Sequence, residues 1–195
     1  MSLQGKKILI DPGHGGYDSG AKGTLNGETI YEKDLALQFA QSAASYLEND
    51  GAEVIMTRTT DKYVGINDRW KMGQANHVDA VISIHWNGKS TTASGTETYY
   101  AQTRPQDKPF AQTIQANVVD RMGSNDRGVL DDTKSAVGSL GILRYPSGAA
   151  YPRALVEIEF ITNPTAMEEL DYPLYETSLD FAAGILFAMR EWFTE

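Results

Sequence analysis

Three histidines and several acidic residues are the side chains of this sequence that could bind a metal ion or move a proton. His14 lies in the glycine-dense stretch ILIDPGHGGYDSGAKG, and His85 ends the apolar run DAVISIHWN. Two histidines at the ends of strands, together with one carboxylate, are a usual ligand set of a hydrolytic zinc ion. The pattern therefore favours one metal site over two unrelated structural histidines. His77, in the polar turn ANHVD, is expected at the surface.

The third ligand would be an acidic residue that the pattern alone does not single out. Four candidates follow His14 in the sequence: Asp18, Glu28, Glu32 and Asp34. Glu32 begins the first predicted long helix and is expected to face back toward the loop of His14, with Glu28 as a plausible rival. Asp11, which precedes a proline, is expected to stabilise its turn through contacts with its own backbone.

The segment LVEIEF places two carboxylates in an otherwise apolar strand. Alternation puts Glu157 and Glu159 on the same face of that strand. Burying a carboxylate among apolar residues is costly unless it has a metal, a partner or a function. The structural alternative is an edge strand with one solvated face. A metal site nearby would favour the functional interpretation.

Strand-like and helix-like segments alternate from one end of the chain to the other. Strands are predicted at 6–10, 52–58, 79–87, 95–101 (with one face exposed to water), 139–144 and 153–160, and helices at 32–50, 67–76, 110–122 and 175–193. This order predicts an α/β fold with three layers, in which helices flank both faces of a twisted, mostly parallel (mixed) sheet of about six strands. We expect a single catalytic domain over 1–195, with residues 1–5 a tag or disordered. Functional groups of such folds gather at the carboxyl ends of strands, where His14, His85 and Glu157 would meet.

Composition and local motifs exclude several classes of protein. The net charge of −9 disfavours binding to nucleic acid, and the absence of cysteine excludes disulfides, thiolate metal sites and cysteine nucleophiles. No apolar run reaches the roughly 18 residues of a membrane span. The glycine-rich stretch does not fit a P-loop, because Lys22 is followed by Gly23 and the helix begins only near Glu32.

Four segments together resemble the zinc-dependent N-acetylmuramoyl-L-alanine amidases, which are bacterial cell-wall hydrolases. They are IDPGHGG, YEKD, SIHWN and LVEIEFITNP, which occur in this order and at similar spacings, and the resemblance extends from residue 7 to about residue 193. It implies that His14, Glu32 and His85 bind one Zn²⁺ per chain and that Glu157 is the catalytic residue. It also selects Glu32 over Glu28.

The resemblance implies a substrate and a location as well. The expected reaction is zinc-dependent hydrolysis of the amide bond between N-acetylmuramic acid and L-alanine in peptidoglycan. It would take place outside the cytoplasm, in the cell wall, in the periplasm or after secretion. No apolar signal core precedes the first strand, so we expect a native signal peptide to be missing from this sequence. A local basic patch, a wall-binding domain or an activator outside this sequence would supply targeting.

Further residues are assigned to the substrate cleft. Asn87 matches an asparagine of the family, and Trp86 and Arg144 are candidates for the cleft walls. Glu159 replaces a residue that is often small in the family, and its charge beside Glu157 would raise the pKa of one of these two carboxyls. Two alternatives are a zinc peptidase that cuts within the stem peptide and a non-catalytic cell-wall-binding module. Glu157 argues against the second, because a binding module needs no base.

Overall fold

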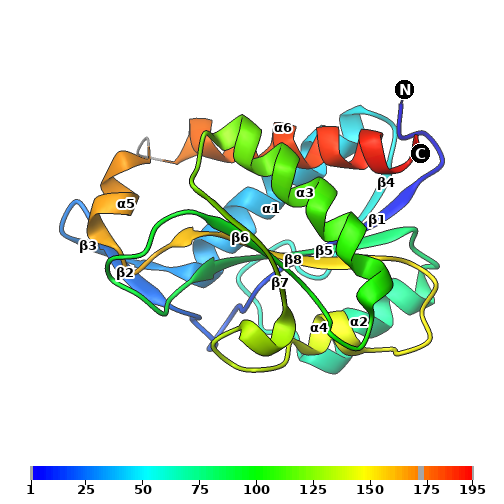
Figure 1. Cartoon of the computed structure of the whole chain (residues 1–195), viewed down its shortest axis with the longest axis horizontal. Coiled ribbons are helices and arrows are strands. Elements are labelled where there is room, and N and C mark those ends of the chain that lie inside the picture. Colours follow the sequence, from blue (N-terminus) through cyan, green and yellow to red (C-terminus); the bar gives the residue numbers. More distant parts are fainter. Residues whose placement is uncertain (1, 171–173, 195) are drawn as a thin grey trace.

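A six-stranded sheet with the order β4-β1-β5-β8-β6-β7 runs through the centre of the molecule. The computed structural model describes residues 2–170 and 174–194 (Figure 1). The strands are β1 (Lys7–Pro12), β4 (Glu53–Met56), β5 (Ala80–Asn87), β6 (Thr96–Tyr100), β7 (Asp126–Asp131) and β8 (Arg153–Phe160). Strands β4, β1, β5 and β8 are parallel, β6 is antiparallel to β8, and β7 is parallel to β6. The predicted mixed, mostly parallel sheet is confirmed.

Helices cover both faces of the sheet and give the three predicted layers. Figure 1 shows α1 (Glu32–Asn49), α3 (Lys108–Met122) and α6 (Tyr175–Trp192) on one face, with α2 (Ile66–Ala75) and α4 (Gly141–Arg144) on the other. The smaller elements are the hairpin of β2 (Lys22–Leu25) and β3 (Glu28–Tyr31), the 3₁₀ turns η1 (Pro105–Asp107) and η2 (Asp132–Lys134), and α5 (Pro164–Glu169). Among the described helices, none has the length and apolar character to cross a membrane.

The larger hydrophobic core lies between the sheet and the layer of α1, α3 and α6. Phe39 of α1 is at its centre, with its ring centroid 5.0 Å from that of Trp86 on β5 and 5.6 Å from that of Phe181 on α6. A smaller cluster fills the space beneath α2 and α4. The central strands read as continuous apolar runs because they are buried on both faces.

Several secondary-structure predictions were wrong or incomplete. Strand β7 and the short helix α5 were not predicted, and two further segments differ from their prediction. Segment 139–144 contains the helical turn α4 and not a strand, and Ile142 and Leu143 are both buried in that turn. A six-residue segment with three large apolar residues is too short for periodicity to separate a helix from a strand. The loop before α1 contains the β2–β3 hairpin, whose Asn26 and Gly27 have φ of 52° and 80°. Asn-Gly with positive φ at both residues is a strong hairpin signal that the sequence analysis missed.

Asp11 does not act through its own turn, as the sequence analysis expected, but joins separate elements in a buried network. Its Oδ1 accepts hydrogen bonds from Thr57 Oγ1 at 2.6 Å and from Arg69 at 2.8 Å. Its Oδ2 accepts from Ser83 Oγ at 2.7 Å. Arg69 belongs to α2 and Ser83 to β5, so one carboxylate fixes the end of β1 against both elements.

Replacing Asp11 by alanine should destabilise the fold by about 3–5 kcal/mol, because the buried Arg69 guanidinium would lose its counter-charge. Chemical denaturation measured by circular dichroism tests this value. The matched control is Asp180→Ala, since Asp180 is an exposed aspartate on α6. Equal stability of the two variants would contradict the role of the network.

Candidate active site

The predicted convergence of His14, His85 and Glu157 is present at the carboxyl ends of the parallel strands. His14 follows β1, His85 lies near the end of β5, and Glu157 lies on β8. The register places Glu157 beside His85 on one side and beside Glu97 of β6 on the other. The Gly13 N–H donates to the carbonyl of Ile84 at 2.9 Å and closes the loop of His14 against β5.

Two buried arginines hold the loop that carries His14. His14 has a φ of 58°, a conformation that is uncommon for a residue with a side chain. Arg69 donates to the His14 carbonyl at 2.6 Å, and Arg58 donates to the Gly13 carbonyl at 2.7 Å. The surrounding structure thus imposes the conformation that directs the imidazole.

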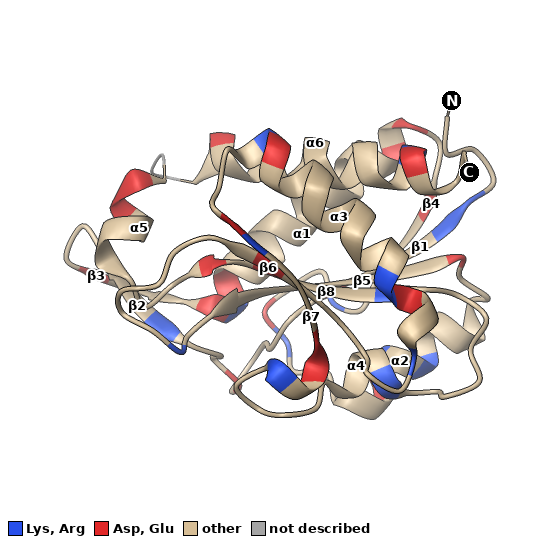
Figure 2. Cartoon of the chain, viewed as in Figure 1, with Lys and Arg blue, Asp and Glu red and all other residues tan. Residues whose placement is uncertain are grey.

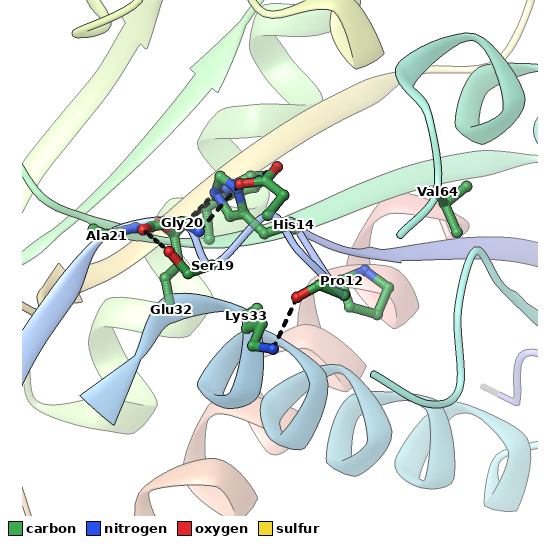
Figure 3. A network of polar contacts seen from close by, with 12 residues as sticks. Pro12, His14, Ser19, Gly20, Ala21, Glu32, Lys33 and Val64 are labelled. Carbon is green, nitrogen blue, oxygen red and sulfur yellow. Dashed lines mark hydrogen bonds and ion pairs between the residues drawn. The ribbon is translucent and has the colours of Figure 1, made fainter. Parts of the chain in front are cut away.

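Three side chains meet around one carboxylate oxygen. His14 Nε2 lies 3.0 Å and His85 Nδ1 lies 2.8 Å from Oε1 of Glu32. The three potential ligand atoms all lie within 4.8 Å of one another. Figure 3 shows His14 and Glu32 pointing toward each other above the first turn of α1. The arrangement presents two imidazole nitrogens and one carboxylate oxygen, which is a donor set that suits a zinc ion.

Glu32 is the one residue of the four acidic candidates that lies between both histidines. It is 4% exposed at the first position of α1, whereas Glu28 and Asp34 are exposed. Its carboxylate accepts hydrogen bonds from the Ala21 N–H at 2.8 Å and the Trp86 N–H at 3.1 Å. Burial opposes its ionisation, but the contacts with the two histidines outweigh burial and hold its pKa well below the usual range.

Asp18, the remaining candidate, lies behind His14. Its Oδ2 is 3.0 Å from His14 Nδ1, a close contact that is not aligned as a hydrogen bond. Burial lowers the pKa of His14, but the contacts with Glu32 and then Asp18 outweigh that effect and raise it. A carboxylate on the far side of an imidazole orients the ring and increases its basicity as a ligand.

Glu157 presents a carboxyl oxygen that no described residue satisfies. Its Oε2 is buried and has no hydrogen-bond partner within residues 2–170 and 174–194. Burial, followed by the charges of Glu32 and Glu97, raises its pKa well above the usual range. An unpartnered buried carboxyl group with a raised pKa is typical of a group that accepts and donates protons during a reaction.

Glu97 is a member of the site that the sequence analysis missed. Alternation in GTETYYA indicated a strand with one wet face, but β6 lies between β8 and β7, and Glu97 is 4% exposed. It accepts from Asn87 Nδ2 at 2.8 Å, from Tyr99 Oη at 2.6 Å and from Arg127 at 2.9 Å. Acidic segments within the sheet at β6 and β8 are visible in Figure 2. A glutamate inside an alternating strand was the available signal.

Glu159 does not lie beside Glu157 as the sequence analysis expected. The pairing of β5 with β8 shifts by one residue after His85, so that Asn87 is opposite Phe160. This bulge separates the surroundings of the two glutamates. The Glu159 carboxylate accepts from the Gly95 N–H at 2.7 Å, and the charge that acts on Glu157 from the sheet is that of Glu97.

The three predicted substrate contacts have different surroundings. Asn87 is half-buried at the site, where its side-chain amide donates to Glu97. Trp86 borders the hollow beside His85, but its ring packs against Phe39 in the core and the residue is 1% exposed. Arg144 pairs with the buried Asp132 beneath the sheet. His77, which was expected at the surface, is exposed as predicted.

Two imidazoles and a carboxylate at the strand ends, next to a carboxyl group without a hydrogen-bond partner in the described residues, are typical of hydrolytic enzymes with an α/β fold. A family model described as N-acetylmuramoyl-L-alanine amidase matches residues 8–186. The chain belongs to this family of hydrolases, as the resemblance implied.

Curated relatives agree with this assignment. N-acetylmuramoyl-L-alanine amidase LytC of Bacillus subtilis is 34% identical over 175 residues, which are 88% of this chain and 33% of LytC. The probable cell wall amidase LytH of Staphylococcus aureus is 35% identical over 164 residues, or 84% of this chain and 50% of LytH. The chain thus spans half or less of these two relatives.

Solved structures share the fold over nearly the whole chain. The N-acetylmuramoyl-L-alanine amidase of Clostridium difficile 630 matches with a TM-score of 0.84 and 29% identity, covering 97% of each chain. The catalytic domain of the amidase CwlV from Bacillus (Paenibacillus) polymyxa matches with a TM-score of 0.80 and 29% identity, covering 97% of this chain and 98% of that one.

Gly13 is predicted to be essential for the position of His85, because a Cβ atom at residue 13 would lie 2.3 Å from the imidazole. At this candidate site, Gly13→Ala should weaken the binding of added Zn²⁺ by about ten- to a hundredfold, the range seen when the orientation of a ligand is disturbed. Competition with a chromogenic chelator measures this affinity. Gly148→Ala is the matched control, since a Cβ atom there meets nothing within 4 Å. Equal affinities would refute the proposed crowding.

Proposed function

We propose that the chain hydrolyses the amide bond between N-acetylmuramic acid and L-alanine in peptidoglycan, with one zinc ion held by His14, Glu32 and His85. The observation that carries this proposal is the meeting of both imidazoles at one Glu32 oxygen, next to the unpartnered Oε2 of Glu157. Family membership supports the choice of substrate. A protein that acts on the cell wall is located outside the cytoplasm, and the relative LytH is named a probable cell wall amidase.

The three residues suit a zinc ion in the chemistry of their side chains and in the hydrogen bonds that hold the Glu32 carboxylate in place. His14 Nε2 and His85 Nδ1 converge on the same point, and backbone N–H groups hold the carboxylate between them. Zinc prefers such mixtures of imidazole and carboxylate ligands, and a catalytic site keeps a further position open. When bound, zinc supplies Lewis acidity toward the attacking water and the scissile carbonyl group.

Glu157 moves the proton in this proposal. Its carboxylate takes a proton from the attacking water as the new C–O bond forms. The same group returns the proton to the alanine nitrogen as the C–N bond breaks. Asn87 and Glu97 flank it, and the hydrogen bond between them fixes the wall of the site on that side. No covalent intermediate is required.

Glu157→Gln should keep zinc but lose hydrolysis by a factor of about 10²–10⁴, because the amide is isosteric and cannot accept the proton. Release of stem peptides from purified peptidoglycan measures turnover, and elemental analysis measures zinc. Glu159→Gln is the matched control on the same strand and should retain most of the activity. Full activity of Glu157→Gln would exclude Glu157 as the base.

His85→Ala should abolish stoichiometric zinc binding, since only two of the three proposed ligands would remain. Chelation of the wild-type protein should remove its activity, and added Zn²⁺ should restore it. His77→Ala serves as the control because His77 is exposed and is not part of the group formed by His14, Glu32 and His85. Mass spectrometry of the products should find free stem peptides that begin with L-alanine, whereas peptides cut internally would indicate a peptidase.

A further inference from the structure

Two hollows in the surface meet at His14 and His85. Tyr63 and Ile66 line one of them, together with the carboxylate of Asp18. The other hollow is lined by Glu157 and, further out, by Asn87 and Lys89. An amide substrate extends in two directions from its scissile bond, with its acyl part on one side and its amine part on the other. Each hollow therefore accommodates one part.

An exposed pair of tyrosines borders the first hollow, where Tyr63 forms part of the lining and Tyr17 stacks on Tyr63. Tyr17 is 82% exposed and Tyr63 is 46% exposed, although both are large aromatic side chains. Their rings stack with centroids 4.3 Å apart and an interplanar angle of 23°. Ile66, which is 46% exposed, extends this apolar surface toward the histidines. Contiguous exposed apolar surface beside a site marks a place where a ligand is bound.

The loops that carry the two tyrosines are fixed to each other. Asp61 accepts hydrogen bonds from the Gly16 N–H at 2.7 Å and from Lys33 Nζ at 2.6 Å, and Lys33 also donates to the Gly16 carbonyl at 3.0 Å. A Cβ atom on Gly16 would lie 2.7 Å from the Tyr63 nitrogen, so a side chain there would push the loops apart. The stacked pair is preorganised, which reduces the entropy lost when a ligand binds.

The chemistry of the reaction decides which part of the substrate enters which hollow. Glu157 lies in the second hollow and must reach the leaving nitrogen, so the amine part, which is the peptide, extends there. The exposed Lys89 ammonium complements the carboxylates of a peptide. The first hollow then receives the acyl part, whose own carboxyl group is used in the amide bond and carries no charge. Asp18 is compatible with such a neutral group.

We propose that Tyr17 and Tyr63 form a saccharide subsite that binds the acetylated amino sugar on the acyl side of the substrate. This inference rests on the proposed function. The open face of Tyr17 would stack against the C–H face of a pyranose ring, and Tyr63 supports it from behind. The subsite gives the chain a preference for amides that carry a glycan over amides that carry only a lactyl group.

Steady-state kinetics on two soluble substrates test the subsite. One is an acetylated disaccharide joined through its lactyl group to a tripeptide, and the other is the lactyl-tripeptide without sugar. Tyr17→Ala should lower the ratio of kcat/KM for the first substrate over the second by about tenfold, mainly through KM. Tyr17→Phe keeps the ring and should keep the wild-type ratio. Tyr175→Ala, which removes a tyrosine 57% exposed on α6, should keep it too.

The outcomes separate the subsite from the reaction. An unchanged ratio in Tyr17→Ala, or an equal loss on both substrates, would overturn the subsite, and a partner protein would then be the better explanation of the exposed rings. Cleavage of neither substrate by the zinc-loaded wild type would overturn the proposed function instead. In that case, titration of the free disaccharide still decides the subsite: shifts of the Tyr17 and Tyr63 ring protons in NMR spectra support it, and their absence refutes it.

Discussion

The carboxylate of Glu32 is the group on which the rest of the site depends. It is a buried negative charge at the first residue of α1. Removing an unpaired charge from water would cost more free energy than the fold could offset. Two backbone N–H groups and two imidazoles compensate for the lost water. Because these donors come from the loop between β1 and β2 and from β5, the ionised carboxylate of α1 holds three separate parts of the chain at one point.

The loop of His14 shows how the fold supports an unfavourable local conformation. Arg58 and Arg69 are nearly inaccessible to water, and their guanidinium groups donate hydrogen bonds to backbone carbonyls of the loop. Asp11 supplies the counter-charge to Arg69. Buried charged side chains therefore keep the backbone of His14 in a left-handed conformation, and this conformation directs the imidazole. A catalytic site requires preorganisation of this kind.

Much of the fold and of the site could be predicted because long-range order followed from local patterns. The alternation of strands and helices predicted a sheet between two helical layers. The positions of His14, His85 and Glu157 at strand ends predicted that these side chains lie close together. The choice of Glu32 came from family resemblance, since four acidic residues fitted the pattern equally well. Glu97 was missed because local alternation cannot report which side chains of other strands will cover a polar face. The core position of the Trp86 ring was not foreseen because the sequence does not reveal which side of β5 faces the layer of α1, α3 and α6.

The bulge between β5 and β8 has a consequence for the two glutamates of β8. The bulge inserts one extra residue of β8 directly after the pair His85 and Glu157. Glu159 therefore contacts the loop at Gly95, although it is only two residues from Glu157 in the sequence. A substitution at 159 would therefore act first on the loop at Gly95, whose N–H the Glu159 carboxylate holds, and not on the surroundings of Glu157. The bulge thus gives two glutamates separate structural tasks within two residues of one strand.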